Sequence, residues 1–311
     1  MDFLVLIVGV AGLWLGTELT VGSALAIARR QQLSEFFVGL VILSIGSDLP
    51  ELAIAVDAGI KSLMGQDASG VVVGTSIGSV IAQIGFVLGL GGILSYLTLP
   101  RQFIYKHGAV LLGATFFLAM VALDGVVTRV EGLILISLYA IYIFALMNGE
   151  NIPEEEPEPV AGGGFRSWLM LATGLAVVIF SSEATVSSVV KLARAFDISE
   201  ALIAVLIIGI GSSLPELSIS ISAILKKKTQ MSVGNIIGSN ILDTLLPIGV
   251  AAVISPVFFE RQLLYYDIPF ILILTGTVLF FFLRKRGIKR TEGAIILSLY
   301  FGYVLFKLTQ F

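Results

Sequence analysis

The sequence has no cysteine and a single histidine, His107, and only 13% of its residues are charged. Without cysteine the chain has no disulfide, no thiolate metal site and no cysteine nucleophile, and one histidine cannot build a zinc site of several histidines. Soluble domains carry about 25% charged residues, so charge is too scarce here for a large soluble domain. The net charge of −3 also argues against a nucleic-acid partner, because nucleic-acid binding needs a basic surface.

Apolar residues take the place of the missing charge, since they make up 57% of the chain and the mean hydropathy is +1.00. The apolar runs predict ten membrane spans, at about 2–28, 34–60, 69–97, 103–124, 128–147, 167–193, 199–225, 230–254, 263–283 and 291–310. Several exceed the roughly 20 residues that a bilayer needs, so these helices are expected to tilt, bend or break. The first run has no basic start and carries Glu18, so we expect a retained span rather than a cleaved signal peptide. The predicted fold is an all-α polytopic membrane protein.

The longest polar interruption is the segment 148–166, NGENIPEEEPEPVAGGGFR. Its glutamates, prolines and glycines predict a flexible linker that cannot build a core. Five glutamates would also suit a calcium-binding tail, but the segment lacks a spaced loop with a turn glycine, so a solvated linker is favoured. The linker divides the chain into two halves of five predicted spans each, 1–147 and 167–311.

The two halves are copies of one another. Residues 16–51 align with residues 181–216 at an offset of 165, which pairs Glu18 with Glu183 and Glu51 with Glu216. Further on, GTSIGSVIAQIG at 74–85 aligns with GNIIGSNILDTL at 234–245 at an offset of 160. Two ordered motifs at matching places in each half are not a chance occurrence.

An odd number of spans in each half makes the second copy enter the membrane from the opposite side, which gives an inverted repeat of the kind found in many secondary transporters. Of the 19 Lys and Arg residues, 13 fall in loops on one side and 6 on the other. The positive-inside rule makes the richer side cytoplasmic, so the linker 148–166 is expected in the cytoplasm and both termini outside. The basic cluster Arg284–Arg290 is expected to set this topology rather than to recognise lipid.

The second and seventh spans each hold a proline and a carboxylate deep within an apolar run, in IGSDLPE at 45–51 and in IGSSLPE at 210–216. Proline removes a backbone donor and collides with the carbonyl four residues back, so each helix is expected to break there. Carbonyls freed inside a membrane must face protein or a water-filled cavity. Together with serine hydroxyls and glutamate oxygens they offer an oxygen-only site, which suits hard cations such as Ca2+ and Na+.

The third and eighth spans add Gly-x-x-Gly-Ser motifs, whose small residues admit the broken helices. Ser79 and Gln83 lie one turn apart on one face, and so do Ser239 and Asp243, so all four are expected to point at the same central site. Four acids at mid-bilayer would cost roughly 10–14 kcal/mol before compensation. With no Lys or Arg nearby in these spans, a bound cation or bound protons must compensate. The acids placed at this site are Asp48, Glu51, Glu216 and Asp243.

Other polar residues in the spans leave alternatives open. Glu18 and Glu183 lie away from the predicted breaks and would suit either hydrogen bonding between helices or the lining of an ion path. Asp57 and Asp124 lie near outer ends and are expected to be solvated. His107 is expected to mark the membrane interface, as aromatic residues at span ends do.

These motifs resemble those of the cation/calcium exchanger superfamily, whose inverted repeats carry G-[ST]-S-L-P-E and G-[NT]-x-I-G-S-N. The similarity covers nearly the whole chain and is greatest to the sodium/calcium exchangers of archaea and bacteria, because the linker is too short for the calcium-sensing domains of animal relatives. The resemblance implies ten helices around a diamond of ion sites, with the first and sixth helices sliding across the other eight. It assigns Ca2+ coordination to Glu51 and Glu216, and the further Na+ or Ca2+ ligands to Ser47, Ser212, Ser213, Ser79, Ser239 and Asp243.

Two positions depart from the family pattern. Asp48 stands where a serine is usual, which adds a negative charge, and Gln83 stands where asparagine or aspartate is usual, which keeps an amide oxygen on a longer arm. The added charge of Asp48 could change the number of ions, the choice of ion or the competition with protons. Proton/calcium exchangers of the same superfamily carry amides at some of these positions and lack the paired Ser-x-x-Glu arrangement. The serines at 47, 212 and 213, with Asp243, favour sodium as the counter-ion.

The predicted function is therefore exchange of Ca2+ for Na+ across the plasma membrane by alternating access, with exchange of Ca2+ or another divalent cation for protons as the alternative. A cation channel would need a continuous pore, usually from a symmetric ring of subunits, which an inverted duplication does not favour. An enzyme is not expected, because no nucleophile–base pair accompanies the acids. We expect no cofactor and no protein partner, only the two ions and the lipid bilayer.

Overall fold

The computed structural model describes residues 2–149, 164–196, 211 and 213–309, and nearly all of them are helical. The long helices of the first half are α1 (Asp2–Gln31), α4 (Leu49–Leu63), α5 (Ser69–Ala82), α7 (Arg101–Val121) and α8 (Arg129–Gly149). Those of the second half are α9 (Phe165–Ala195), α12 (Leu214–Leu225), α13 (Thr229–Ile254), α14 (Ile268–Lys285) and α15 (Arg290–Leu308). Shorter pieces extend them: α2 (Glu35–Phe37), η1 (Val38–Leu43), α3 (Ser44–Ser47), η2 (Gln83–Val87), α6 (Leu88–Leu94) and η4 (Leu263–Asp267).

These helices match the predicted spans closely. Within the described residues, eight helices are long and apolar enough to cross a membrane, and a bent pair, Glu35–Ser47 with Leu49–Leu63, makes a ninth. Helix α12 is shorter, and the predicted span 199–225 lies in part outside the described residues. The protein is a multi-pass membrane protein.

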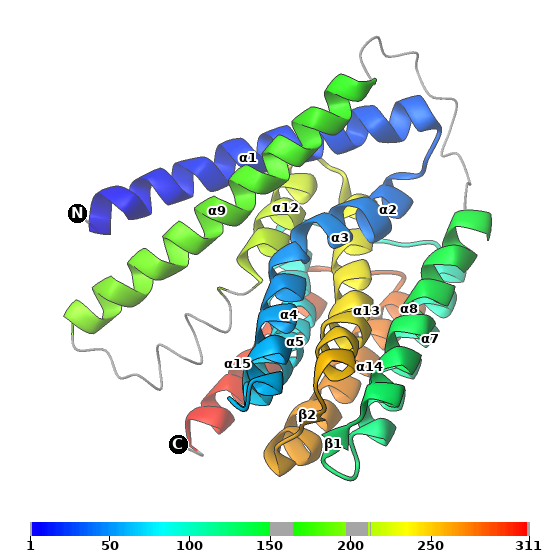
Figure 1. The fold of residues 1–311 in the computed structure, drawn as a ribbon. Coiled ribbons are helices and arrows are strands. Elements are labelled where there is room, and N and C mark those ends of the chain that lie inside the picture. Colours follow the sequence, from blue (N-terminus) through cyan, green and yellow to red (C-terminus); the bar gives the residue numbers. More distant parts are fainter. Residues whose placement is uncertain (1, 150–163, 197–210, 212, 310–311) are drawn as a thin grey trace.

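Helices α1 and α9 lie side by side and cross the rest of the molecule obliquely (Figure 1). Small residues bring them close: a Cβ added at Gly16 would meet Val178 at 2.9 Å, and one added at Gly174 would meet the Thr20 nitrogen at 2.8 Å. Close backbone approach of this kind drives helix association where lipid removes the hydrophobic force. The two helices therefore pack mainly against each other.

Helix α13 is enclosed by helices of both halves, because it packs against α4, α5, α7, α8 and α12. Of its most apolar 18-residue window, 83% is buried, against 28% for α8 and α9. A helix that is enclosed by protein on all sides can hold polar residues that would be too costly against lipid. α13 is therefore the position in this fold where charged or polar side chains are best shielded from the bilayer.

Two kinds of contact between the halves occur twice. Gly89 lies against Gly293 in the same way that Gly249 lies against Gly132, with positions shifted by 160 or 161. At the linker end, where α8 stops and α9 begins, a β-bridge joins Leu97 to Ile288.

At the opposite end, which we call the ribbon end, strand β1 (Val126–Val127) pairs antiparallel with β2 (Val257–Phe258). Val127 faces Val257 there, a pair that corresponds to Ile288 and Leu97 under the same shift. Each end of the bundle thus joins the first half to the second through backbone hydrogen bonds.

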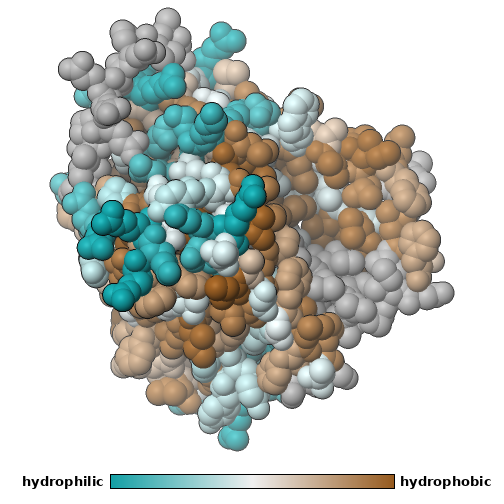
Figure 2. Space-filling model, turned by 180° about the vertical axis from the view of Figure 1, so that it is seen from behind, coloured by the Kyte–Doolittle hydropathy of each residue, from teal (hydrophilic) through white to brown (hydrophobic). Residues whose placement is uncertain are grey.

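The outer surface is apolar where a bilayer would contact it. Figure 2 shows apolar surface over the lobe at its right, which α1 and α9 form, and over much of the lower half. Large exposed apolar side chains on α1 include Phe3, Leu4, Ile7 and Trp14, each at least 60% exposed. Contiguous apolar patches of this extent mark a surface that meets lipid or another protein.

The glycine contacts between halves predict a packing defect. Gly132→Val would drive a side chain against the Gly249 carbonyl and the Ala252 Cβ, each 2.8 Å from the added Cβ, and overpacking typically costs 1–3 kcal/mol. We expect a lower thermal unfolding temperature for the purified protein in detergent. Gly276→Val, on α14 with no atom within 4 Å of the added Cβ, is the control and should unfold as wild type does. Equal unfolding temperatures for the two variants would contradict the packing argument.

Candidate functional site

The chain bends where the first Pro-Glu motif was predicted to break it. The helix axis turns by 42° between Ser47 and Leu49, which confirms the predicted disturbance in the second span. The helix is bent rather than fully interrupted, because the Asp48 nitrogen still donates to the Ser44 carbonyl at 3.0 Å and the Leu52 nitrogen donates to the Asp48 carbonyl at 3.2 Å. Pro50 stands in the first turn of α4, where its missing N–H has no partner to lose.

The second Pro-Glu motif has the same local geometry. Ser213, which corresponds to Asp48, has φ −95° and ψ 15°, against −86° and 5° for Asp48. Both residues occupy N-cap positions, yet neither side chain makes a capping hydrogen bond. Aspartate and serine are preferred caps, so side chains of this kind that do not cap are available for another partner.

Glu51 and Glu216 lie in the first turns of α4 and α12. The positive end of a helix dipole favours a carboxylate at that position. Both glutamates are buried, at 4% and 0% exposure, and so is Asp48 at 0%. The two Pro-Glu motifs therefore deliver three acids to the interior of the protein.

These three carboxylates form one cluster. One ligand atom from each of Asp48, Glu51 and Glu216 lies within 4.8 Å of the other two. Among the described residues, Asp48 Oδ2, Glu51 Oε2 and both carboxylate oxygens of Glu216 have no hydrogen-bond partner. At this separation two ionised carboxylates repel by on the order of 3 kcal/mol in an effective dielectric constant of about 20. The cluster therefore needs positive charge to be stable, and its oxygen ligands suit a hard cation.

The fourth predicted acid lies in an adjoining network. The Gln83 amide nitrogen donates to Asp243 Oδ2 at 3.0 Å and to Ser79 Oγ at 2.9 Å. The Ser79 hydroxyl is 2.9 Å from that of Ser213, which ties the network to the second Pro-Glu motif. Asp243 Oδ1 has no partner among the described residues. Asp243 thus keeps one oxygen free while Gln83 fixes the other.

Asn240 is a member of this network that the sequence interpretation missed. Its amide nitrogen donates to the Gln83 side-chain oxygen at 3.0 Å, so that oxygen, the predicted ligand atom, already has a partner in this structure. The repeat alignment contained a signal for Asn240, because this polar residue of the second half stands where the first half has the apolar Val80. One turn of helix separates Asn240 from Asp243 and brings both beside Gln83.

The remaining predicted ligands fall in two places. The Ser47 hydroxyl lies 3.5 Å from Asp48 Oδ1, and Ser239 is fully buried with an unpartnered hydroxyl. Ser212 lies outside the described residues. Apart from Ser212, every predicted site residue is buried in the interior around α13.

Other polar residues lie away from the cluster. Glu18 forms an ion pair with Lys226 at 2.8 Å, so it joins α1 to the end of α12. Asp57 is solvated as predicted and pairs with Lys61 at 2.6 Å on the same helix, and Asp124 is exposed as predicted. Glu183 is also exposed.

The prediction that His107 marks the membrane interface is wrong. Its side chain has 0% exposure, and Nδ1 is 2.8 Å from the Tyr142 hydroxyl. The ring packs against those of Phe36 and Phe103, with centroids 5.1 and 6.0 Å away. His107 lies almost two turns inside α7, on the face that packs against α2 and α8, and a histidine there is held by aromatic and hydroxyl neighbours rather than by the interface.

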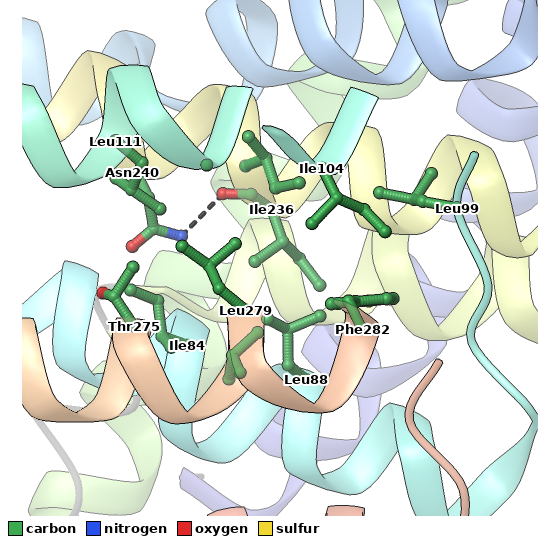
Figure 3. Close-up of a pocket in the computed structure, with 13 residues that line it drawn as sticks. Ile84, Leu88, Leu99, Ile104, Leu111, Ile236, Asn240, Thr275, Leu279 and Phe282 are labelled. Carbon is green, nitrogen blue, oxygen red and sulfur yellow. Dashed lines mark hydrogen bonds between the residues drawn. The ribbon is translucent and has the colours of Figure 1, made fainter. Parts of the chain in front are cut away.

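A small pocket beside Asn240 is not a second candidate for the ion site. Figure 3 shows the side chains that line it, with the Asn240 amide donating at 2.6 Å to the Ile236 carbonyl. Of its 13 lining residues only Asn240 and Thr275 carry side-chain oxygens, and the rest are apolar or glycine. Hard cations require several oxygen ligands, which this pocket does not offer.

Fold and site together define a multi-pass membrane protein with a buried carboxylate site. Residues 1–148 and 166–309 match the sodium/calcium exchanger protein family, and the chain belongs to this family. The family consists of membrane ion exchangers rather than enzymes, and Na+ and Ca2+ are the substrates that it implies.

The relatives agree along nearly their whole length. The putative antiporter CaxA of Alkalimonas amylolytica is 30% identical, covering 94% of this chain and 93% of its own. The sodium/calcium exchanger MaX1 of Methanosarcina acetivorans is 25% identical and covers 98% of both chains. The structure of the sodium-calcium exchanger NCX_Mj soaked with 10 mM Na+ and zero Ca2+ superposes with a TM-score of 0.83 at 29% identity, covering 98% of each chain.

The repulsion within the cluster predicts that removing one of its acids affects stability differently with and without cations. Glu216→Gln removes one buried charge at nearly constant shape, so without added cations the variant should unfold at a temperature no lower than wild type. Ca2+ should stabilise wild type, by about 2.7 kcal/mol at one hundred times its dissociation constant, but not the variant. Thermal unfolding in detergent, with and without Ca2+, measures both effects. Asp57→Asn, at an exposed ion pair, is the control and should respond as wild type does. A full Ca2+ response in Glu216→Gln would contradict the assignment.

Proposed function

We propose that the chain is a secondary antiporter that exchanges Ca2+ for Na+ by alternating access. The observation that carries the proposal is the cluster of Asp48, Glu51 and Glu216. Their ligand atoms lie within 4.8 Å of one another, and several of their carboxylate oxygens have no hydrogen-bond partner in the part of the chain that the structure describes. The names of MaX1 and NCX_Mj, both sodium/calcium exchangers, support the choice of ions.

The proposed ligands are oxygen atoms from both halves of the chain. Glu51 and Glu216 bind Ca2+ directly, and hydroxyl and carboxylate oxygens around them complete the sites for Ca2+ or Na+. Their burial around α13 supports this set for the described members. The full set is Ser47, Asp48, Glu51, Ser79, Gln83, Ser212, Ser213, Glu216, Ser239 and Asp243.

Coupling follows from the electrostatics of the cluster. An empty site of four carboxylates is too costly to carry through the apolar barrier, so the protein changes access only when cations neutralise it. Ca2+ and Na+ compete for the same oxygens and cannot be bound fully together. A Na+ gradient directed into the cell then drives Ca2+ out.

The proposed architecture has ten helices in two inverted repeats, residues 1–147 and 167–311, joined by the acidic linker 148–166. The doubled contacts support it, because Gly89 with Gly293 is matched by Gly249 with Gly132, and Leu97 with Ile288 is matched by Val257 with Val127. Backbone pairs that match at opposite ends of the bundle are what an inverted repeat produces.

In the proposed cycle, α1 and α9 move together across the remaining helices. Their oblique course, their mutual packing through small residues and their exposed apolar surface support this role. We place the protein in the plasma membrane with the linker in the cytoplasm and both termini outside, as the distribution of Lys and Arg favours.

The counter-ion has one alternative that a specific residue favours. Asp48 adds a third carboxylate to the cluster, beside Glu51 and Glu216, and protons could neutralise it in place of a sodium ion. The hydroxyl-rich surroundings, with Ser79 and Ser213 2.9 Å apart beside the cluster, favour sodium.

The counter-ion is tested by 45Ca2+ uptake into proteoliposomes at clamped voltage, with an outward Na+ gradient compared with an outward proton gradient. We expect uptake with the Na+ gradient alone, because Na+ and Ca2+ compete for the proposed site. Uptake driven by protons alone would move the protein to proton/calcium exchange. Uptake that persists without any counter-ion gradient would indicate a channel.

Substitutions in the cluster test the site itself. Glu51→Gln and Glu216→Gln should each abolish Na+-driven 45Ca2+ uptake while the proteins elute as folded species on size exclusion. Asp48→Ser, which restores the residue usual in the family, should keep exchange but shift its dependence on Na+ or pH. Normal uptake by both glutamine variants would refute the ligand set, and an unchanged profile for Asp48→Ser would make Asp48 a structural residue.

A further inference from the structure

A row of buried polar side chains runs along α13 from the carboxylate cluster toward the linker end. Ser232, Asn235, Ser239 and Asp243 recur every three or four residues and so share one face of the helix. All four have 0% exposure. Ser232 lies about 16 Å along the helix axis from Asp243, so the row covers much of the distance from the site to the helix start.

The row faces α12. The Asn235 amide nitrogen donates to Ser220 Oγ at 3.1 Å, and Ser220 lies one turn beyond Glu216 on α12. One further turn brings Ala223, whose short side chain is also fully buried and leaves little bulk opposite the start of α13. Glu216 and Ser220 thus form a polar surface on α12 that lies alongside the row on α13.

Most of the oxygens in this row have nothing to bond with. Ser232 Oγ, Asn235 Oδ1 and Ser239 Oγ are buried and lack hydrogen-bond partners among the described residues. A buried polar group left unpaired typically costs 1–3 kcal/mol, and native proteins satisfy such groups with protein or ordered water. Three in a line therefore require a polar occupant at some stage of the protein's cycle.

The corresponding surface of the first half is different. Under the repeat offsets, Ser232 corresponds to Val72, Ser220 to Ala55 and Asn235 to Thr75. Thr75 donates to its own helix, to the Val71 carbonyl at 2.7 Å. The first half therefore has no unpaired oxygen at these positions, although the Ser69 and Ser76 hydroxyls elsewhere on α5 are buried and have no partner among the described residues. The two halves thus differ in the positions at which unpaired oxygens lie.

Two ion pairs lie where the row reaches the surface. Lys228, at the N-cap of α13, pairs with Glu35 of α2 at 2.5 Å, and Lys226 pairs with Glu18 of α1. Each pair neutralises a lysine that would otherwise repel a cation, and each joins the α12–α13 turn to a helix of the first half. Both lysines lie within six residues of Ser232, in the turn at which the row ends.

We propose that this row is the hydrated route between the carboxylate cluster and the linker end, with Asn235 and Ser232 as oxygen ligands that cations contact in passing. The inference rests on the proposed function, since it supplies one side's access to the exchange site. The route opens when α1 and α2 release the two lysines, which admits water to the unpaired oxygens.

Because the protein has no cysteine, a single introduced cysteine is the only thiol that a probe can modify. The purified Ser232→Cys variant is treated with a cationic, membrane-impermeant methanethiosulfonate in Na+, in Ca2+ and without either ion. Val72→Cys, at the corresponding buried position with 1% exposure, is the matched control. We expect modification at least tenfold faster at position 232 in one or more conditions. Rates as slow as those of Val72→Cys in all three would overturn the proposal, whether or not the protein exchanges sodium.

The side of access is read from vesicles. Ser232→Cys should react faster in inverted membrane vesicles, which expose the cytoplasmic face, than in right-side-out ones. Faster reaction in right-side-out vesicles would overturn the assignment to the linker end.

A second variant separates a route residue from a structural one. Ser232→Val, which installs the residue of the first half, should slow Ca2+ exchange at least tenfold while equilibrium 45Ca2+ binding stays within about twofold of wild type. Thr75→Val, at a partly buried hydroxyl bonded to its own helix, should change neither. Exchange at the wild-type rate in Ser232→Val would refute its role, and joint loss of exchange and binding would mark Ser232 as structural.

Discussion

The structure depends on a group of buried acids that no cationic side chain neutralises within the described residues. Asp48, Glu51 and Glu216 share a space less than 5 Å across, and Asp243 adjoins it. Such a cluster is unfavourable when empty, so the positive charge that balances it must come from ions that can leave. The rest of the fold serves this constraint, because a carboxylate can be kept inside a bilayer only where protein shields it. The enclosed helix α13 and the two Pro-Glu motifs provide that shielding.

The local chain geometry supplies the site at some cost to the helices. Asp48 and Ser213 occupy cap positions without capping, which gives up a contribution of about 1 kcal/mol at each helix start. Their side chains instead face the acids or the Ser79 hydroxyl. Residues that satisfy their own helix are poor ion ligands, so the unfavourable local choice is what makes these oxygens available.

The sequence predicted the helical spans and the burial of the four acids well, because both follow from local patterns: apolar run length, Pro-Glu motifs and helical spacing. It predicted poorly what depends on neighbours from distant helices. The partner of the Gln83 oxygen is Asn240, the partner of Glu18 is Lys226, and His107 is enclosed by aromatic rings. None of these pairs is close in sequence, and periodicity carries no information about which helix faces which. Of these contacts, only the one between Gln83 and Asn240 had any signal in the sequence, because the comparison of the two halves places the polar Asn240 opposite the apolar Val80.

The two oblique helices differ from the others in length, and this has a consequence for the lipid. α1 has 30 residues and α9 has 31, so each is about 45 Å long, whereas a bilayer core is about 30 Å thick. They fit only by inclining, and each ångström of change in bilayer thickness alters the cost of that inclination by a fraction of a kcal/mol. The remaining helices are tied together at both ends by backbone pairing, at Leu97 with Ile288 and at β1 with β2. Membrane thickness therefore acts chiefly on the inclined pair, and in the proposed cycle, in which this pair moves, lipid composition would help to set the rate of exchange.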